Sequence, residues 1–284
     1  MIDPKGFRLM GIVNVTPDSF SDGGRFLAPA AAVEHGLRLV AEGAALLDVG
    51  GESSRPGAEP VGEREELRRV QPVIEGLAAA EAGAQLSIDT SKAAVARAAL
   101  AAGASFVNDV SALRADPEMA GVIAERGAGC CLMHMLGEPR TMQRDPRYED
   151  VVDEVKSFLL ERLEFAVAQG IEEQAIVLDP GIGFGKTLAH NLELLRRLDE
   201  LVELGRPLLI GTSRKSFLGR LIGSAPGPDL LAATLASNVL ALERGASVFR
   251  VHDVAPMREA LTVAAATLSE RWRASSQATT TARS

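Results

Sequence analysis

The sequence predicts an α/β protein built as a single (β/α)8 barrel. Short apolar runs alternate with longer segments of helical spacing, and this alternation occurs eight times. The 238 residues from Asn14, after the first run, to His252, after the eighth, cover seven repeats of 34 residues on average, which suits successive βα units. Polar residues capable of chemistry follow nearly every run, as the active face of a barrel requires. An open doubly wound sheet, the alternative fold, would gather such residues at one switch point.

The predicted strands are short and mostly apolar, as expected of strands buried on both faces of a parallel sheet. In chain order they are Leu9–Val13, Ala45–Val49, Leu86–Ile88, Ser105–Val107, Cys130–Met135, Ala175–Leu178, Pro207–Ile210 and Ser247–Val251. The carboxyl ends of such strands open on one face of a barrel.

The segments between the strands are rich in Ala, Leu, Glu and Arg and have helical spacing. They include Ala30–Glu42, Arg64–Ala79, Val151–Ala168 and Leu192–Leu204. Glycine follows many of them, as expected where helices end. The residues from Arg273 onward are polar and lack the apolar side chains that would order them. We therefore predict one barrel domain over residues 1–272 and a disordered polar tail over residues 273–284.

Length, charge and cysteine content exclude several classes of protein. A chain of 284 residues can bury enough surface to need no disulfide or metal support. Its two cysteines, Cys130 and Cys131, are neighbours, so a disulfide framework is untenable, and they match no zinc-ligand spacing. The net charge of −8 weighs against nucleic acid as a partner. With no secretory signal and no charge-free run of about 18 apolar residues, we expect a cytoplasmic protein with no membrane partner.

Helix capping explains some of the polar residues after the strands, but not the whole set. Asp, Asn, Ser and Thr commonly cap helices, and we interpret Thr90, Ser91 and Asp116 in this way. Caps do not require cationic side chains, yet Lys215 and Arg250 follow or end the last two strands. The strand-end residues are Asn14, Asp48, Asp89, Asn108, Asp109, His134, Asp179, Ser213, Lys215, Arg250 and His252.

The strand-end residues divide into two chemical groups. Hydrogen-bond acceptors suited to a flat ligand with several N–H donors are Asp89, Asn108 and Asp179. Side chains suited to binding an anion are Arg55, Lys215, Arg250 and His252. Asn14 offers a neutral oxygen that could complete the ligand shell of Mg²⁺, which usually keeps several waters and bridges substrate phosphates. A heterocycle that carries a phosphate or diphosphate would satisfy both groups.

The glycine-rich stretch 181–187 is not a nucleotide-binding loop. The first glycine of a P-loop would have to stand five positions before Gly185, where the sequence has Pro180. We interpret the glycines instead as residues that let the backbone turn tightly over a flat ligand. Phe184 would then form a wall of the binding site.

Nine short motifs of the sequence resemble those of the dihydropteroate synthases, folate-pathway enzymes that join a pterin to para-aminobenzoate. The motifs are Asn14–Gly24, Gly50–Gly57, Ser87–Thr90, Asn108–Val110, His134–Met135, Thr141–Gln143, Asp179–Lys186, Ser213–Ser216 and Arg250–Asp253. They occur in family order and span about residues 10–253. Each motif alone is weak, but together and in order they are very specific.

The resemblance implies a transferase that condenses 6-hydroxymethyl-7,8-dihydropterin diphosphate with 4-aminobenzoate and releases diphosphate, and that is a target of sulfonamides. The pterin would be held by Asp89, Asn108, Asp179 and Lys215, and the diphosphate by Arg55, Arg250 and His252, with Arg250 also flanking the pterin ring. Ser54 and Ser216 would lie near 4-aminobenzoate, the loop through Phe20 and Asp22 would close over the site, and Asn14 would ligate Mg²⁺. Family members are typically homodimers.

The implied reaction needs no nucleophile and base of the triad kind. Loss of diphosphate is favoured by neutralising its charge, and it leaves a cationic methylene conjugated to the pterin. Asp89 and Asp179 would stabilise that cation, Lys215 would orient the ring, and Arg250 and His252 would assist the leaving group. The arylamine is already nucleophilic, so we expect dissociative substitution with little acid–base catalysis.

Three other functions stay open. A pterin-dependent methyltransferase barrel would share the Asp and Asn contacts but lack the diphosphate set of Arg55, Arg250 and His252. A sugar-phosphate aldolase or isomerase would need a lysine inside a strand or a paired acid and base, and neither stands out in the sequence. A non-catalytic pterin-binding relative could keep most of the pocket, but the predicted lid with Phe20 and Asp22 favours turnover.

Overall fold

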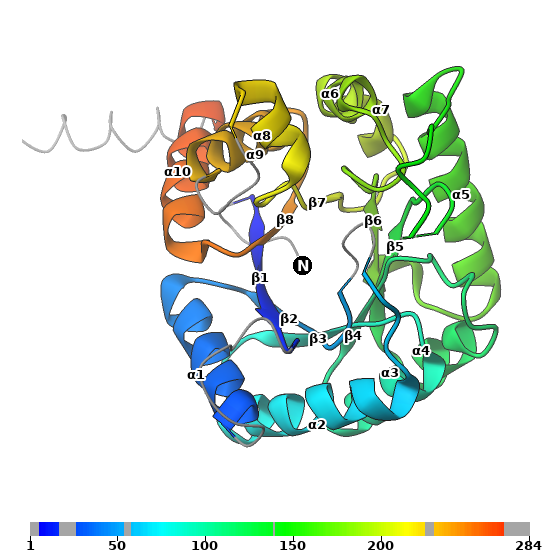
Figure 1. Cartoon of the computed structure of the whole chain (residues 1–284), viewed down its shortest axis with the longest axis vertical. Coiled ribbons are helices and arrows are strands. Elements are labelled where there is room, and N and C mark those ends of the chain that lie inside the picture. The colour runs from blue at the N-terminus through cyan, green and yellow to red at the C-terminus, as the bar shows by residue number, and fades with distance from the viewer. Residues whose placement is uncertain (1–5, 17–26, 54–57, 139, 225–229, 270–284) are drawn as a thin grey trace, which may run out of the picture.

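Eight parallel strands surround the centre of the molecule, and helices cover their outer side (Figure 1). The computed structural model describes residues 6–16, 27–53, 58–138, 140–224 and 230–269. The strands are β1 (Arg8–Asn14), β2 (Leu46–Gly50), β3 (Gln85–Asp89), β4 (Phe106–Asp109), β5 (Gly129–Met133), β6 (Ile176–Asp179), β7 (Leu209–Ile210) and β8 (Val248–Val251). Their hydrogen-bonded order is β6-β5-β4-β3-β2-β1-β8-β7. A parallel bridge between Leu178 and Leu208 joins the two edges, which confirms the predicted barrel.

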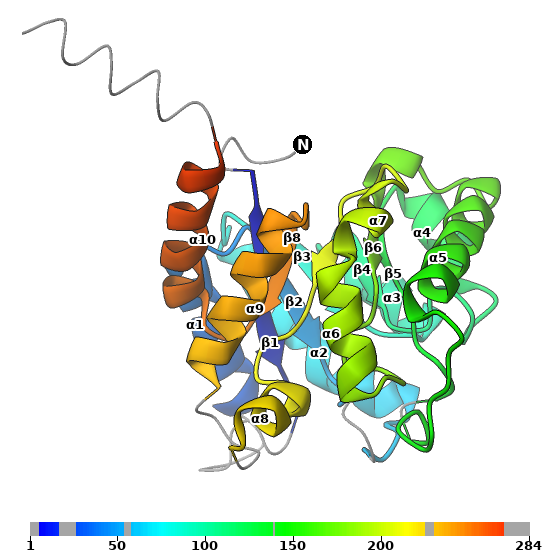
Figure 2. The same ribbon diagram turned by 90° about the horizontal axis from the view of Figure 1, so that it is seen from above.

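The connections between the strands are largely helical, and Figure 2 shows them flanking the strands on both sides of the barrel. The helices are α1 (Leu27–Glu42), α2 (Glu63–Ala79), α3 (Ala93–Ala101), α4 (Met119–Arg126), α5 (Val151–Ala168), α6 (Leu188–Arg196), α7 (Leu198–Val202), α8 (Ser216–Ile222), α9 (Leu231–Glu243) and α10 (Val254–Leu268). No helix in the described part of the chain is long and apolar enough to span a bilayer.

The prediction of one helix over Leu192–Leu204 is wrong. The structure has two helices there, α6 and α7, which meet at Arg197, whose backbone leaves the helical region at φ −108° and ψ 28°. The Arg197 guanidinium donates to Asp150, the residue that caps α5, over 2.7 Å and to Glu200 over 2.7 Å. These contacts accompany the break between the helices. The contact of Arg197 with Asp150 cannot be predicted from the periodicity of the segment, because Asp150 lies far away in the sequence.

Strand alternation gives the barrel interior an apolar floor and a polar mouth. Side chains on one face of a strand recur at every second residue. One buried apolar cluster takes a side chain from six strands: Met10, Leu46, Phe106, Cys131, Leu209 and Val248. Two residues further along the same strands stand Asp48, Asn108 and Arg250, which bond to one another across the barrel. The floor therefore supports a polar layer at the carboxyl ends of the strands.

Adjacent cysteines in β5 lie on opposite faces of the strand. Cys130 packs with the apolar layer between strands and helices, and Cys131 belongs to the barrel floor. Both are fully buried and unbridged, so the prediction that they are small core residues is confirmed. Burial raises the pKa of the Cys130 thiol to about 12, which makes it inert at neutral pH.

Two of the three residues interpreted as caps do cap a turn or helix. Asp116 accepts from the Ala93 amide at the start of α3 over 2.9 Å and from the Glu118 amide over 3.0 Å. Thr90 accepts from the Lys92 amide over 3.2 Å. The predicted tail at residues 273–284 lies outside the described residues, so its disorder stays a prediction.

Candidate active site at the mouth of the barrel

Asp48 is the centre of the polar layer. Its carboxylate is fully buried and accepts three hydrogen bonds: from Ser87 over 2.6 Å, from Asn108 over 2.9 Å and from the Arg250 Nε over 2.6 Å. The register explains the arrangement, because Asp48 pairs with Ser87 in the neighbouring strand. The three donors, one of them cationic, satisfy the hydrogen-bonding capacity of the buried carboxylate and pair its charge. Asp48 therefore fixes the side chains of Asn108 and Arg250 from below.

Arg250 links Asp48 to Asp89, the last residue of β3. Its Nη2 donates to the Asp89 Oδ2 over 2.8 Å. Only 13% of the Asp89 side chain and 22% of the Arg250 side chain is exposed, so water screens this pair weakly. One guanidinium thus serves two carboxylates and leaves an excess of negative charge at the mouth.

Burial is the largest influence on Asp89. It raises the pKa of the Asp89 carboxyl to about 7, against the opposing effect of Arg250 and with a smaller raising effect of Asp48. Dehydration disfavours the charged form of a carboxyl group. Burial removes the water that would hydrogen-bond to the Asp89 carboxylate. The N–H donors of a ligand would replace these hydrogen bonds, so Asp89 is suited to accept them.

Asp179 and Lys215 form the other charged part of the mouth. Burial raises the pKa of the Asp179 carboxyl, and Lys215 is the leading influence in the opposite direction. Burial lowers the pKa of the Lys215 ammonium to about 8, and Asp179 opposes that shift. Asp179 also accepts from the Gly181 amide over 2.6 Å. The two groups stabilise each other's charged forms inside a weakly hydrated site.

The glycine-rich turn after β6 lies against the end of β5. A Cβ at Gly181, where φ is +66°, would stand 1.9 Å from the carbonyl oxygen of His134, so no other residue fits there. The turn brings the Phe184 ring to 4.5 Å from the Lys215 Nζ, a cation–π contact. Phe184 also packs against a methionine cluster of Met133, Met135 and Met142. The turn thus places an apolar ring beside Lys215, and the role of this ring as a wall of the ligand site stays a prediction.

His252 is fixed by the loop after β7. Its Nδ1 lies 3.0 Å from the Ser213 Oγ, and its backbone amide donates to the same oxygen over 3.2 Å. Arg214 next to Ser213 donates twice to Asp253, over 3.1 Å and 2.6 Å. These bonds tie the loop after β7 to the end of β8 and orient the His252 ring.

The structure brings together most of the expected site residues that lie in the described ranges. Contacts or direct electrostatic interactions join Asp89, Asp179, Phe184, Lys215 and Arg250, and Asn108 is linked to Arg250 through Asp48. Asn14 ends β1, and Ser216 is the exposed first residue of α8. The remaining expected residues, Phe20, Asp22, Ser54 and Arg55, lie outside the described residues. Their roles stay predictions.

Sequence reasoning missed several residues that build the site. Asp48 was singled out only as a strand-end residue, and Ser87 only within a motif. Strand alternation was the available signal, because Asp48 and Ser87 stand two residues after Leu46 and Gln85 on the inward face. Lys186 and His134 were given no role, and the structure joins them over 2.9 Å.

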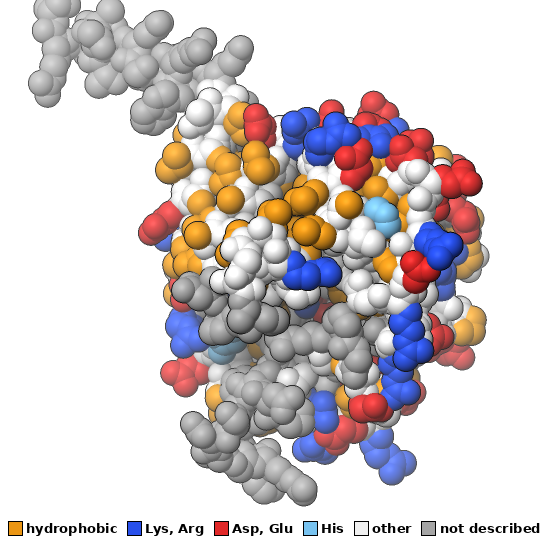
Figure 3. All heavy atoms as spheres, turned by 45° about the horizontal axis from the view of Figure 1, so that its top comes forward, with side chains coloured by type: hydrophobic (Ala, Val, Ile, Leu, Met, Phe, Trp, Pro, Cys, Tyr) orange, Lys and Arg blue, Asp and Glu red, His pale blue; other side chains and the backbone are white. Residues whose placement is uncertain are grey.

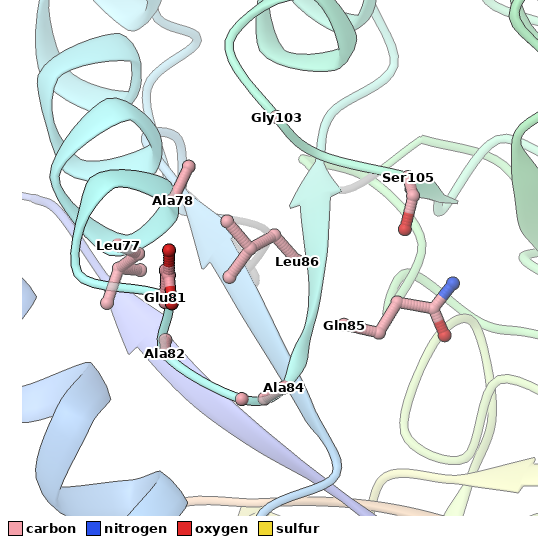
Figure 4. Close-up of a pocket in the computed structure, with 10 residues that line it drawn as sticks. Leu77, Ala78, Glu81, Ala82, Ala84, Gln85, Leu86, Gly103 and Ser105 are labelled. Atoms are coloured by element: carbon pink, nitrogen blue, oxygen red, sulfur yellow. The ribbon is translucent and has the colours of Figure 1, made fainter.

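A hollow of about 400 Å³ lies at the opposite end of β3 from Asp89. Figure 4 shows it between the end of α2 and the start of β3, with Leu77, Gln85, Leu86 and Ser105 on its walls. In parallel barrels the strand carboxyl ends carry the chemistry, and the amino ends serve stability. The hollow is therefore separate from the candidate active site.

Comparisons with known proteins agree with this geometry. A family model for pterin binding enzymes matches residues 10–252. The dihydropteroate synthase of Mycobacterium leprae is 51% identical over 268 residues, which covers 92% of this chain and 93% of that protein.

Solved structures give the same result. A dihydropteroate synthase of Xanthomonas albilineans with 4-aminobenzoic acid superimposes with a TM-score of 0.85 at 52% identity, covering 90% of this chain and 91% of that chain. The same enzyme in complex with 7,8-dihydropteroate gives a TM-score of 0.81 at 50% identity, with 90% and 92% covered.

Proposed function

The chain belongs to the family of pterin-binding enzymes and acts as a dihydropteroate synthase, and we propose that the polar mouth of its barrel performs this reaction. The enzyme is a transferase: it condenses 6-hydroxymethyl-7,8-dihydropterin diphosphate with 4-aminobenzoate and releases diphosphate. The observation that supports the assignment of residues is a pair of buried carboxyl groups, Asp89 and Asp179, in one mouth with Lys215 and Arg250.

The acceptors of the mouth bind the pterin. A pterin ring is flat and presents several N–H donors along one edge. Asp89 and Asp179 have lost most of their water, so hydrogen bonds from such donors stabilise their charged forms. Asn108, held by Asp48 over 2.9 Å, adds an amide oxygen. Lys215 donates to the oxygen or nitrogen atoms of the ring, and Phe184 covers its face.

The reaction proceeds by dissociative substitution at the methylene carbon of the pterin. The bond between the methylene carbon and the diphosphate oxygen breaks, and its electron pair leaves with that oxygen. The cationic methylene is stabilised by the excess negative charge of Asp89 and Asp179. The amine nitrogen of 4-aminobenzoate then donates its lone pair to form the C–N bond and releases a proton to water. No residue has to activate the amine.

Cationic side chains bind the leaving diphosphate. Arg250 uses two of its five N–H donors for Asp48 and Asp89, and we propose that its other donors bind the diphosphate. His252, oriented by Ser213, and Arg55 complete the set. Each charge-assisted contact lowers the barrier to departure because negative charge grows on the diphosphate.

Asn14 would be the protein ligand of a Mg²⁺ ion at the mouth. Within the described ranges there is no cluster of three or more His, Cys, Asp or Glu side chains that could hold a metal by themselves. Asn14 at the end of β1 offers an amide oxygen, which suits a Mg²⁺ that takes its remaining ligands from diphosphate and water. The ion would neutralise diphosphate charge. Chelation should therefore stop turnover, and added Mg²⁺ should restore it.

We propose that Ser54 and Ser216 bind 4-aminobenzoate and that Phe20 and Asp22 belong to a loop that closes over it. This assignment rests on the motifs that contain these residues and on the place of Ser216 next to Lys215 at the start of α8. Product formation from 4-aminobenzoate should then be inhibited competitively by sulfonamides.

The protein forms a homodimer through the neighbouring helices α9 and α10. Figure 3 shows apolar side chains gathered on one face of the molecule. Among the exposed apolar residues of these helices, Leu240 is 56% exposed, Val263 69% and Leu268 52%. A dimer interface would cover such residues. Leu240→Glu should lower the mass measured by sedimentation from dimer to monomer, and Leu160→Glu on α5 is the matched control; a wild-type monomer would exclude this interface.

A balanced product assay tests the enzymatic assignment. Wild-type protein mixed with pterin diphosphate, 4-aminobenzoate and Mg²⁺ should release diphosphate and 7,8-dihydropteroate in equal amounts. Well-folded protein that binds pterin yet forms no dihydropteroate would instead be a non-catalytic pterin-binding relative.

A further inference from the structure

The turn after β6 is held by side chains rather than by a regular backbone ladder. Four consecutive carbonyl oxygens each accept a hydrogen bond from a different side chain. The pairs are Ile182 with the Lys215 Nζ, Gly183 with the Gln143 Nε2 over 2.6 Å, Phe184 with the Lys186 Nζ over 2.9 Å, and Gly185 with the Tyr148 hydroxyl over 2.8 Å. The position of Phe184 therefore depends on these donors.

Lys186 is the most deeply placed of the four donors. It is fully buried and belongs, with Phe217 and Phe249, to the largest fully buried side chains of the described residues. Its Nζ reaches three acceptors: the Phe184 carbonyl and the His134 Nδ1, both over 2.9 Å, and the His134 carbonyl over 3.4 Å. An apolar side chain would be cheaper to bury, so the amine is retained for the geometry that its bonds impose.

His134 can serve as an acceptor because its ring stays neutral. Burial and the neighbouring Lys186 lower the pKa of His134 to about 2, so at neutral pH one ring nitrogen lacks a proton. The ring packs edge-on against Phe158 at a centroid distance of 4.9 Å. The backbone amide of His134 donates to the Asp179 carbonyl over 2.9 Å. The ring and the backbone of His134 are thus both held in place, between the ends of β5 and β6.

We propose that Lys186 is a positioning residue for the pterin site. By joining the Phe184 carbonyl to His134, it holds the turn in the shape that places the Phe184 ring against Lys215 and the Gly181 amide on Asp179. This inference rests on the proposed function, because it assumes that Phe184, Lys215 and Asp179 bind the pterin. Lys186 itself does not contact the substrate.

Replacing the amine without changing the length of the side chain tests this role. Lys186→Met should weaken binding of 6-hydroxymethylpterin, measured by calorimetry, by about tenfold, as the loss of a buried hydrogen-bond network implies. The KM for pterin diphosphate should rise similarly, while the KM for 4-aminobenzoate should change less than about twofold. Lys156→Met, which removes an exposed lysine paired with Glu203, should leave both constants unchanged.

A purely structural role gives a different pattern. It would lower Tm and the active fraction of Lys186→Met but leave the pterin affinity of the folded protein unchanged, and that result would overturn the proposal. An equal rise in both KM values would also overturn it.

Two His134 variants test the same positioning role if Lys186→Met does not fold. His134→Asn keeps an acceptor near the Nδ1 position, and His134→Leu removes it at similar volume. The Leu variant should weaken pterin binding by about tenfold and the Asn variant by less than about threefold. Equal affinities in the two variants would contradict the role of the Lys186–His134 bond.

A ligand-free measurement separates this inference from the proposed function. In wild-type protein the Phe184 amide donates to the Gly181 carbonyl over 3.0 Å, so it should exchange slowly. Lys186→Met, or His134→Leu if needed, should speed its hydrogen exchange by at least about tenfold. This result holds even if the wild-type protein forms no dihydropteroate, whereas unchanged exchange would refute the positioning role.

Discussion

The floor and the mouth of the barrel are built from the same strands, but the floor stabilises the fold and the mouth carries the function. The floor, represented by Met10, Phe106 and Cys131, buries apolar side chains that stabilise the fold. The mouth, two residues further along, buries carboxyl groups whose charged forms burial disfavours. Two residues along the same inward face of the strands therefore separate stability from function. At the mouth, burial therefore disfavours the charged carboxylates, and hydrogen bonds from a ligand would offset that cost.

The largest expected effect comes from breaking the floor. Phe106→Ala should lower the free energy of unfolding by about 3–5 kcal/mol, because it removes a buried ring and leaves a cavity. Denaturant unfolding measures this loss, and Phe106→Leu should lose less. The KM values of the folded variant should stay near those of wild type. A large rise in KM for pterin diphosphate would show that floor and mouth are not separable.

Removing a carboxylate charge from the mouth should lower activity rather than stability. Asp89→Asn should lower kcat/KM for pterin diphosphate by about 100-fold, because it removes charge that stabilises the cationic methylene. Steady-state kinetics measure the loss. Asp109→Asn is the control at a neighbouring carboxyl group, since Asp109 is fully buried and accepts from the amides of Ser111 and Leu113, both over 2.8 Å. If both variants lost activity alike, the mouth would have no special role.

The same substitution should change how stability depends on pH. Because burial raises the pKa of Asp89 to about 7, the folded state keeps a proton that the unfolded state loses above about pH 4. Wild-type stability from this group therefore falls as pH rises from about 4 to 7 and is level above that. Asp89→Asn should remove that decline, which amounts to about 4 kcal/mol between pH 4 and pH 7. Parallel stability curves for the two proteins would contradict the raised pKa.

The fold and much of the mouth could be predicted from sequence because their signals are local. Each strand is a short apolar run, and Asp89, Asn108 and Asp179 stand where such runs end. The break at Arg197 could not be predicted, since its guanidinium contacts Asp150 far along the chain.

The hydrogen bonds of the network beneath the ligand site also could not be predicted from the sequence. Strand alternation places Asp48 and Ser87 on the inward face, but the three bonds to Asp48 also depend on which strands pair and in what register. The partnership of Lys186 with His134 likewise joins residues 52 positions apart. Residues that touch a ligand recur in recognisable motifs, whereas the residues that hold them in place are defined by packing.

Proton release on pterin binding tests the central claim most directly, since N–H donors from the pterin should lower the pKa of Asp89 from about 7. Calorimetric titration with 6-hydroxymethylpterin at about pH 7, in buffers of different ionisation enthalpy, measures the number of protons released. We predict a fractional proton release by wild-type protein that Asp89→Asn abolishes. Binding without proton release, or the same release from Asp89→Asn, would contradict the account.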